Sequence, residues 1–334
     1  MAHSLRPVAA SADADDDRQF TVADAQRVYT LATKDTRLGG KVREALDVVE
    51  RALDEYGLER IALSFNGGKD CTVLVHLLAA AILRRQDPSL SDSPSPSSAS
   101  TSSRSLPPIP TIYVRCPSPF PQVEAFVALC ARWYALELET VEGGMREALQ
   151  VYVDRRKTSL TDGASAQRGA IKAVLVGTRR NDPHGQHLQP FSPTDAGWPD
   201  FMRVHPILNW SYGDVWAFLR AGELTLGAGA GDAEEEWKRN RLECYTSLGS
   251  THNTFPNPLL RATTSGPISR PSSPTSAARE KVGQPLGGWR PAWELEDESA
   301  ERAGRETSLS KVLEQTRLSP PTTITTGMNG AERG

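Results

Sequence analysis

The sequence lacks the features that would tie it to a membrane, a disulfide framework or a polyanion. Among its 334 residues are only four cysteines, and none of them forms a C-x-x-C pair. A zinc site or a disulfide scaffold is therefore not expected, and a reducing compartment fits. No apolar stretch reaches the about 18 uncharged residues of a membrane-spanning helix. With a formal net charge of −3, the chain has no strong overall field to attract nucleic acid or an anionic membrane.

The first residues, MAHSLRPVAASADADDD, lack both the apolar core of a signal peptide and the acid-poor composition of a transit peptide. We therefore expect a cytoplasmic protein that binds neither nucleic acid nor a membrane. The sequence does not fix the oligomeric state, and we take a monomer as the expectation.

Composition separates segments that can build a core from segments that cannot. Stretches rich in Ser and Pro, or in small and acidic residues, bury too little apolar surface to order themselves. The predicted segments in chain order are a disordered N-terminus (1–19), a core (20–222) with a disordered Ser/Pro insertion (87–110), a C-terminal extension (223–305) with a low-complexity stretch (262–287), and a disordered tail (306–334).

Within the core, apolar runs of strand length alternate with helical patterns. The predicted strands cover 60–65, 111–114, 136–141 and 172–177. The predicted helices cover 21–34, 41–56, 71–85, 122–134 and 146–155, and Ser211 caps a further helix. This alternation predicts an α/β fold with a doubly wound, mainly parallel sheet and helices on both faces. In such a fold, ligands bind at the carboxyl ends of the strands.

Between the first predicted strand and its helix lies the loop 66–70, NGGKD. Gly67 and Gly68 have no Cβ, so the backbone can take a positive φ and approach a phosphate closely. The N–H groups of the loop and the positive end of the helix converge on one point. Lys69 can add a point charge there. The stretch therefore predicts an anion cradle.

The loop belongs to neither of the two commonest phosphate-binding motifs. A Walker A motif needs G-x-x-x-x-G-K-[ST], whereas Asp70 follows the lysine here, and a dinucleotide fingerprint needs G-x-G-x-x-G. A Gly-Gly pair alone is more often a structural turn, but the flanking strand and helix patterns agree with a cradle. The loop resembles the pyrophosphatase loop (PP-loop), S-x-G-G-K-D-[ST], of the adenine-nucleotide alpha-hydrolase superfamily. Members hold the β and γ phosphates of ATP and transfer AMP.

Further strings agree on one family within that superfamily. They are SFNGGKD (64–70), PSPFPQVEAF (117–126), GTRRNDP (177–183), WPDFMRVHPILNWSYGDVWAFLR (198–220), YTSLG (245–249), NPLL (257–260), WRPAWELED (289–297) and ERAGR (301–305). Together they resemble eukaryotic, fungal-type FAD synthase, or FMN adenylyltransferase, which is similar in fold to phosphoadenylylsulfate reductase. The resemblance implies a PP-loop fold with a C-terminal extension over the active site.

The resemblance also implies a reaction, FMN + ATP → FAD + pyrophosphate with Mg²⁺, and roles for particular residues. The FMN phosphate is the nucleophile and is already ionised near pH 7, so no protein base is required. The implied roles are ATP and phosphate binding by Ser64, Asn66, Gly67, Gly68, Lys69, Val114, Arg179 and Arg180; FMN binding by Asn181, Asp182, Trp198 and Arg302; catalysis by Asp70, Asp182, Arg302 and Arg305; and Mg²⁺ binding by Asp70 and Asp182.

Simpler explanations remain for several of these residues. The two adjacent arginines Arg179 and Arg180 could be an exposed edge pair, and tryptophans such as Trp198 are more often core residues than flavin-stacking ones. Arg302 and Arg305 share one face of a helix, so they could also be an ordinary i,i+3 pair.

Two other functions remain open from the residues. A phosphoadenylylsulfate reductase would need a catalytic cysteine in a Glu-Cys-Gly-like motif, and Cys244 follows Glu243 but precedes Tyr245 instead of glycine. An inactive flavin-binding protein is the other alternative. It is suggested by the segment 227–244, which departs from the family pattern that precedes YTSLG.

Overall fold

The structure is a computed structural model that describes residues 19–86, 105–158, 169–222, 224, 244–262 and 288–305. The predicted tail at 306–334 lies outside these residues, and so do most of the predicted N-terminal, insertion and low-complexity segments. Their disorder, and the domain boundaries drawn from it, stay predictions. No helix within the described ranges is long and apolar enough to cross a membrane.

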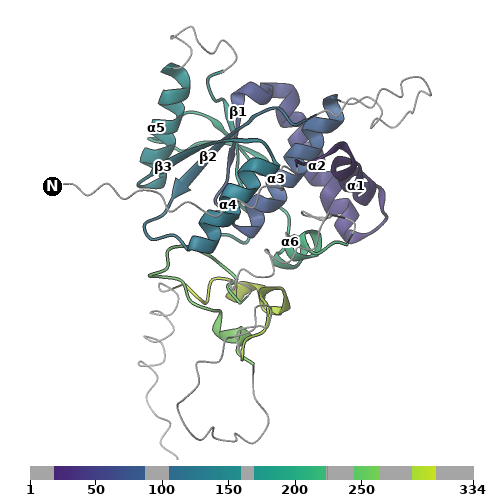
Figure 1. Cartoon of the computed structure of the whole chain (residues 1–334), viewed down its shortest axis with the longest axis vertical. Coiled ribbons are helices and arrows are strands. Elements are labelled where there is room, and N and C mark those ends of the chain that lie inside the picture. The colour runs from purple at the N-terminus through teal and green to yellow at the C-terminus, as the bar shows by residue number, and fades with distance from the viewer. Residues whose placement is uncertain are drawn as a thin grey trace, which may run out of the picture.

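A six-stranded sheet forms the centre of the molecule (Figure 1). Its strands are β1 (Ile61–Ser64), β2 (Ile109–Arg115), β3 (Leu136–Glu142), β4 (Ala173–Leu175), β5 (Phe191–Pro193) and β6 (Met202–Val204). The order is β3-β2-β1-β4-β6-β5, and every neighbouring pair is parallel except β5 with β6. The predicted mainly parallel α/β fold is confirmed.

The strands predicted at 60–65, 111–114, 136–141 and 172–177 correspond to β1 to β4, whereas β5 and β6 at the far edge of the sheet were not predicted. β5 (FSP) and β6 (MRV) have three residues each and, unlike the equally short β4 (AVL), contain no continuous apolar run. β2 begins at Ile109, so the end of the segment predicted as an insertion (87–110) belongs to the sheet. Ile109 is completely buried, which explains why the chain is ordered there.

The helices are α1 (Val22–Thr33), α2 (Arg37–Tyr56), α3 (Lys69–Gln86), α4 (Pro121–Trp133), α5 (Met145–Thr158) and α6 (Tyr212–Leu219). All were predicted, but α2 begins before the predicted start at Lys41. The reason is an N-cap at Thr36, whose side chain accepts a hydrogen bond of 3.0 Å from the Gly39 N–H. At α6, Ser211 and Asp214 form the capping box that the sequence indicated.

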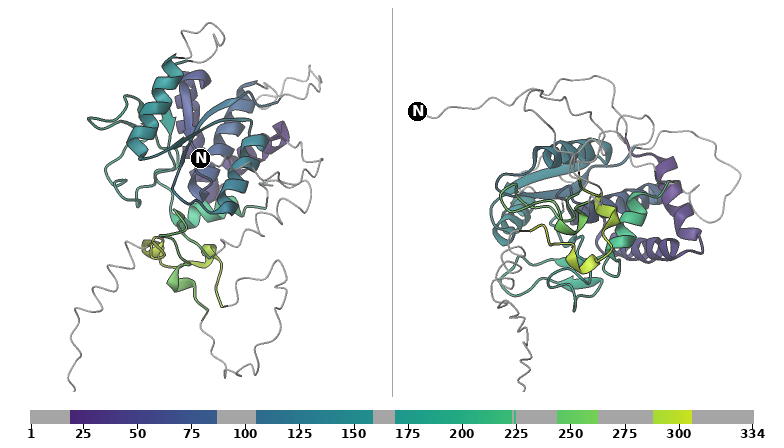
Figure 2. Two further views of the ribbon diagram at one scale, coloured as in Figure 1. Left: turned by 60° about the vertical axis from the view of Figure 1, so that its left-hand side comes forward. Right: turned by 90° about the horizontal axis from the view of Figure 1, so that it is seen from below.

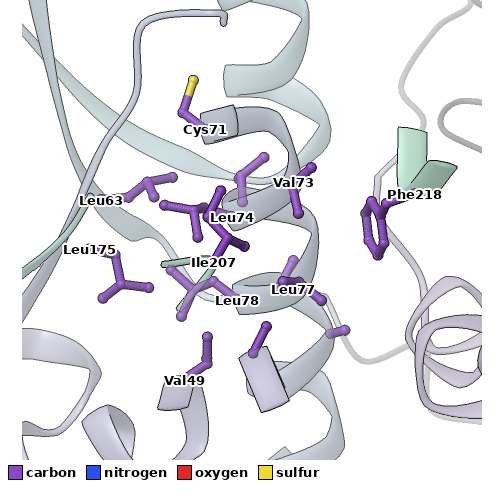
Figure 3. Packing of buried hydrophobic residues seen from close by; sticks show 14 of the residues in the cluster. Val49, Leu63, Cys71, Val73, Leu74, Leu77, Leu78, Leu175, Ile207 and Phe218 are labelled. Carbon is purple, nitrogen blue, oxygen red and sulfur yellow. The ribbon is translucent and has the colours of Figure 1, made fainter. Parts of the chain in front are cut away.

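Helices cover both faces of the sheet. α5 packs on one face through residues such as Leu149 and Tyr152, in a cluster separate from the main core. On the other face, Leu63 of β1 and Leu175 of β4 lie against Leu74 of α3 (Figure 3). Every residue of α3 from Cys71 to Leu83 is buried. This burial fixes the start of α3, and with it the loop that precedes the helix.

Two segments near the C-terminus, 244–262 and 288–305, lie together beyond α6 (Figures 1 and 2). Isolated β-bridges join them, from Thr254 to Arg305 and from Arg261 to Trp289. Otherwise they consist mostly of turns and short 3₁₀ helices. They reach the ends of β1, β2 and β4, where they complete one side of a pocket.

Candidate active site

The loop between β1 and α3 has the positive backbone φ that its glycines predict. Gly67 has a φ of 71°, in the left-handed region. A Cβ on Gly67 would also lie 3.0 Å from the Val127 side chain and 3.1 Å from that of Val123. The Gly68 N–H donates to Asn66 Oδ1 at 3.0 Å. Since α3 begins at Lys69, these loop amides lie at the positive end of a long helix.

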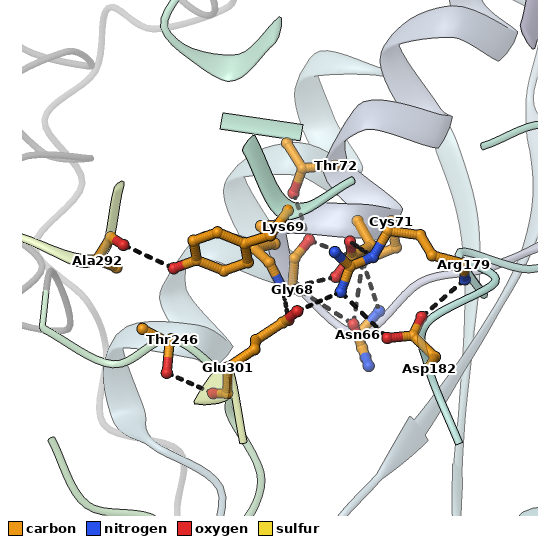
Figure 4. Close-up of polar contacts among 12 residues, drawn as sticks. Asn66, Gly68, Lys69, Cys71, Thr72, Arg179, Asp182, Thr246, Ala292 and Glu301 are labelled. Atoms are coloured by element: carbon orange, nitrogen blue, oxygen red, sulfur yellow. Dashed lines mark hydrogen bonds and ion pairs between the residues drawn. The ribbon is translucent and has the colours of Figure 1, made fainter. Parts of the chain in front are cut away.

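Beneath the loop lies a network of two cations and three carboxylates (Figure 4). Arg179 is at its centre, with a side chain only 2% exposed. Its guanidinium lies 2.9 Å from Asp70 Oδ1, 3.1 Å from Asp182 Oδ1 and 2.6 Å from Glu301 Oε2. The contact with Asp70 is an ion pair without the alignment of a hydrogen bond. Lys69 Nζ contacts Asp70 Oδ2 at 2.9 Å and also Glu301 Oε1.

The neighbouring charges of this network shift the pKa values of its side chains. Burial works against the charge on Lys69, yet Asp70 and Glu301 together raise its pKa above the usual value. Burial raises the pKa of Asp182, Arg179 opposes this, and the other two carboxylates raise it further. Three carboxylates on two cations leave an excess negative charge. An anion in the pocket therefore needs positive charge from elsewhere.

The network opens into a pocket of about 500 Å³, a size typical of small-molecule sites. Many of the residues singled out from the sequence line it, namely Ser64, Asn66, Gly67, Gly68, Lys69, Asp70, Val114, Asp182 and Arg302. They come from the ends of β1, β2 and β4 and from the C-terminal segment. The structure thus brings together residues that the sequence keeps far apart, while their individual roles stay predictions.

Other predicted residues lie outside the pocket lining. Arg180 is one of these. Its guanidinium contacts Asn209 Oδ1 at 2.8 Å and 3.0 Å, and also the carbonyl oxygens of Gln186 and Leu188. Its side chain therefore holds the loop after β4 in place.

Two of the predicted FMN-binding residues are exposed and do not line the pocket. Asn181 is exposed next to Asp182, which does line it. Trp198 is 39% exposed in the connection from β5 to β6. The geometry of the pocket therefore gives no support to the roles predicted for Asn181 and Trp198.

Aromatic residues that the sequence analysis did not assign to the site form much of the pocket wall. They are Phe120, Tyr245, Trp216 and Trp293. The Trp216 and Trp293 rings meet edge to face at 5.9 Å, and those of Phe120 and Tyr245 at 5.5 Å. They provide the apolar surface that a flat aromatic ligand needs. No signal in the sequence separates these aromatic residues from core residues, because their places in the wall depend on how the segments dock.

Arg302 and Arg305 lie on consecutive turns, not on a regular helix. The Arg305 N–H donates to the Arg302 carbonyl at 2.9 Å. Arg302 lines the pocket, and the Arg305 guanidinium packs against Gly249 so closely that a Cβ there would lie 2.1 Å from Nη2. Burial and then Arg302 lower the pKa of Arg305. Within the described residues, no carboxylate pairs with either side chain, but only Arg302 lines the pocket, and Arg305 does not.

The carboxylates of the pocket leave limited room for a metal site. In the parts of the chain that the structure describes, no group of three or more His, Cys, Asp or Glu side chains is arranged to hold a metal ion. Asp70 and Asp182 line the pocket, and both are engaged by Arg179. An ion held by these two side chains would therefore need its other ligands from phosphate oxygens and water.

Comparison with known proteins agrees with this geometry. A phosphoadenosine phosphosulfate reductase domain matches residues 60–256. A probable FAD synthase of Schizosaccharomyces pombe is 31% identical over 293 residues, covering 85% of this chain and 87% of the relative. The flavin adenine dinucleotide synthase of Saccharomyces cerevisiae is 30% identical over 279 residues, covering 73% and 81%. The crystal structure of Candida glabrata FMN adenylyltransferase with FAD and inorganic pyrophosphate superimposes with a TM-score of 0.59 and 25% identity, covering 86% and 98%.

Proposed function

The chain belongs to the FAD synthase family and carries a phosphoadenosine phosphosulfate reductase domain, and we propose that its pocket is where AMP passes from ATP to FMN. The function is that of an FMN adenylyltransferase, which converts FMN and ATP into FAD and pyrophosphate.

One observation carries the assignment of the pocket. The glycine loop at the start of α3, Lys69 and Arg302 all line one cavity with aromatic walls, and no carboxylate pairs with Arg302 among the described residues. The polar part of this cavity suits a chain of phosphates, and the aromatic part suits a flat ring system. An ATP molecule and a flavin phosphate combine these two kinds of surface.

In the proposed mechanism, a phosphate oxygen of FMN attacks the α-phosphorus of ATP. A new P–O bond forms, the bond from the α-phosphorus to the bridging oxygen breaks, and its electron pair leaves with pyrophosphate. Asn66, Gly67, Gly68 and Lys69 hold the leaving pyrophosphate, and Ser64 and the backbone at Val114 line the ATP side. Arg302 and Arg305 balance charge on the phosphates. The protein mainly positions and stabilises charge, because the nucleophile is already ionised.

Asp70 and Asp182 are the carboxylates that would hold Mg²⁺ beside the phosphates. The ion would offset the negative charge of ATP and of the carboxylate-rich floor of the pocket. Removing it with a chelator should therefore stop FAD formation.

We also propose that the chain acts as a monomer in the cytoplasm. The support for the compartment is the low cysteine content, four in 334 residues with no C-x-x-C pair, which fits a reducing environment. Size-exclusion chromatography with light scattering tests the first part of this proposal. Fractionation of cells tests the second.

The deciding experiment incubates purified protein with ATP, Mg²⁺ and FMN and separates the flavins by chromatography. FAD and pyrophosphate should appear in equal amounts. In Lys69→Ala the rate should fall by about 10²–10³, the usual effect of removing one preorganised charge contact at a reacting group. Bound flavin without turnover would favour an inactive flavin-binding protein.

Reduction of phosphoadenylylsulfate is the remaining alternative. It needs an accessible cysteine, whereas Cys244 is only 4% exposed. Substituting Cys244 with Ser should therefore leave FAD formation intact.

A further inference from the structure

Glu301 belongs to the C-terminal segment, yet its carboxylate ends at the floor of the pocket (Figure 4). Oε1 accepts a hydrogen bond from Lys69 Nζ, and Oε2 accepts one of 2.6 Å from Arg179. The side chain is only 13% exposed. Lys69 is 232 residues away along the chain and Arg179 is 122 residues away, so the contact exists only because the segment docks there.

The ammonium group of Lys69 lies between two carboxylates and one aromatic ring. Asp70 Oδ2 lies 2.9 Å from it, Glu301 Oε1 contacts it from the C-terminal segment, and the Tyr212 ring centroid lies 5.3 Å away. An ammonium has three N–H donors, so two carboxylates leave one donor for an anion in the pocket. A lysine side chain with several rotatable bonds is thereby reduced to one orientation.

Glu301 is itself fixed by a buried polar network. Thr246 Oγ1 donates to the Glu301 carbonyl. Asn257, which has no exposed surface, donates to Thr246 Oγ1 at 2.9 Å and to the Ala300 carbonyl at 2.8 Å. A satisfied buried network of this kind is rigid. The carboxylate is therefore presented to Lys69 from a fixed point.

We propose that Glu301 is a positioning residue for AMP transfer: by holding the Lys69 ammonium in one orientation, it aims the remaining N–H at the leaving pyrophosphate. The proposal rests on the proposed function. It gives the C-terminal segment a second task, in addition to carrying Arg302 and Arg305. It also means that the ATP side of the pocket is complete only when the segment is docked.

A plain tether between the segment and the core would be a simpler role, and a nearby residue already has it. The Glu298 carboxylate accepts from the Tyr212 N–H at 3.2 Å and the Gly213 N–H at 2.9 Å, at the start of α6. Glu298 does not line the pocket. Glu298→Gln is therefore a matched control, with the same chemical change in the same segment but away from Lys69.

The first test compares Glu301→Gln with that control. An amide keeps one acceptor but turns an NH₂ group toward a cation, so the orientation of Lys69 is lost. In Glu301→Gln, kcat should fall at least about tenfold, because small displacements at a phosphoryl-transfer site cost up to about 10² in rate. The KM for ATP should rise, whereas the KM for FMN should stay within about twofold. A residue that only attaches the C-terminal segment to the core would not affect the two KM values differently. Glu298→Gln should keep kcat within about twofold.

The second test is a double-mutant cycle with Lys69→Ala. Because Glu301 acts through Lys69, adding Glu301→Gln to Lys69→Ala should cost less than about threefold in kcat. Glu301→Asp, which keeps the charge on a shorter side chain, should recover part of the loss. The proposal is wrong if Glu301→Gln keeps wild-type kcat, if Glu298→Gln loses as much, or if the two losses multiply in full. If the wild-type protein forms no FAD, the proposed function fails instead, so the two failures are distinguishable.

Discussion

Arg305 is a residue whose replacement should stabilise the protein and slow the reaction at the same time. Its guanidinium is half-buried against Gly249 and has no carboxylate partner among the described residues. Burial and Arg302 lower its pKa, which means that the folded protein holds this charge at a cost. Removing an arginine from an ion pair leaves a carboxylate unpaired, whereas replacing Arg305 leaves no such carboxylate among the described residues.

The expected magnitudes follow from that environment. By analogy with a like-charge i,i+3 pair on a helix surface, which costs about 0.2–0.5 kcal/mol, Arg305→Gln should raise the Tm by about 1 °C. The same change removes a cation next to Arg302, at the edge of the proposed phosphate site. If Arg305 has its predicted catalytic role, kcat should fall by about 10²–10³. Arg305→Lys keeps the charge but loses the two-pronged contact, so kcat should fall about tenfold with the Tm nearly unchanged.

The assay measures three quantities for each variant: kcat for FAD formation, FMN affinity from fluorescence quenching, and Tm at low and high salt. The gain in Tm should disappear at high salt, because screening removes the repulsion between the two arginines. FMN affinity should change much less than kcat. If Arg305→Gln lowers the Tm and keeps wild-type kcat, Arg305 is a structural residue and the reasoning is refuted.

Three other predictions concern stability. Gly40→Ala should raise the unfolding free energy by about 0.5–1 kcal/mol, because a Cβ at Gly40 meets nothing within 4 Å. Gly39→Ala should lower the unfolding free energy, because its Cβ would lie 2.3 Å from a backbone oxygen. Urea titrations of the two variants test this difference. Burial lowers the pKa of His76 to about 3, so below about pH 6.5 the unfolded chain binds a proton that the folded chain does not. Stability should therefore fall by up to about 1.4 kcal/mol per pH unit as the pH drops toward 3, and His76→Phe should flatten that slope in denaturation at several pH values. Arg180→Gln should lower stability by about 1 kcal/mol in urea and change FAD formation by less than about threefold, since its hydrogen bonds lie outside the pocket; a 10²-fold loss of rate would contradict this.

Features that depend on contiguous residues could be predicted from the sequence. The strand, glycine loop and helix at 60–85 follow one another directly, so their periodicity and punctuation carry the local structure. The strings that resemble FAD synthases are also local, and they identified the family before any contact was known. The capping box at Ser211 was recognisable for the same reason.

Other features were decided only by tertiary contacts. Arg179 and Arg180 are adjacent and chemically equal in the sequence, yet one is buried among three carboxylates and the other holds a loop. Nothing local distinguishes Trp198 from Trp216, of which only the second lines the pocket. Glu301 meets Lys69 across a sequence separation of 232 residues, so its position depends on how the C-terminal segment docks on the core. Local sequence patterns determine which helices and strands form. The docking of distant segments determines which side chains share the pocket, because docking depends on the shape of the whole core.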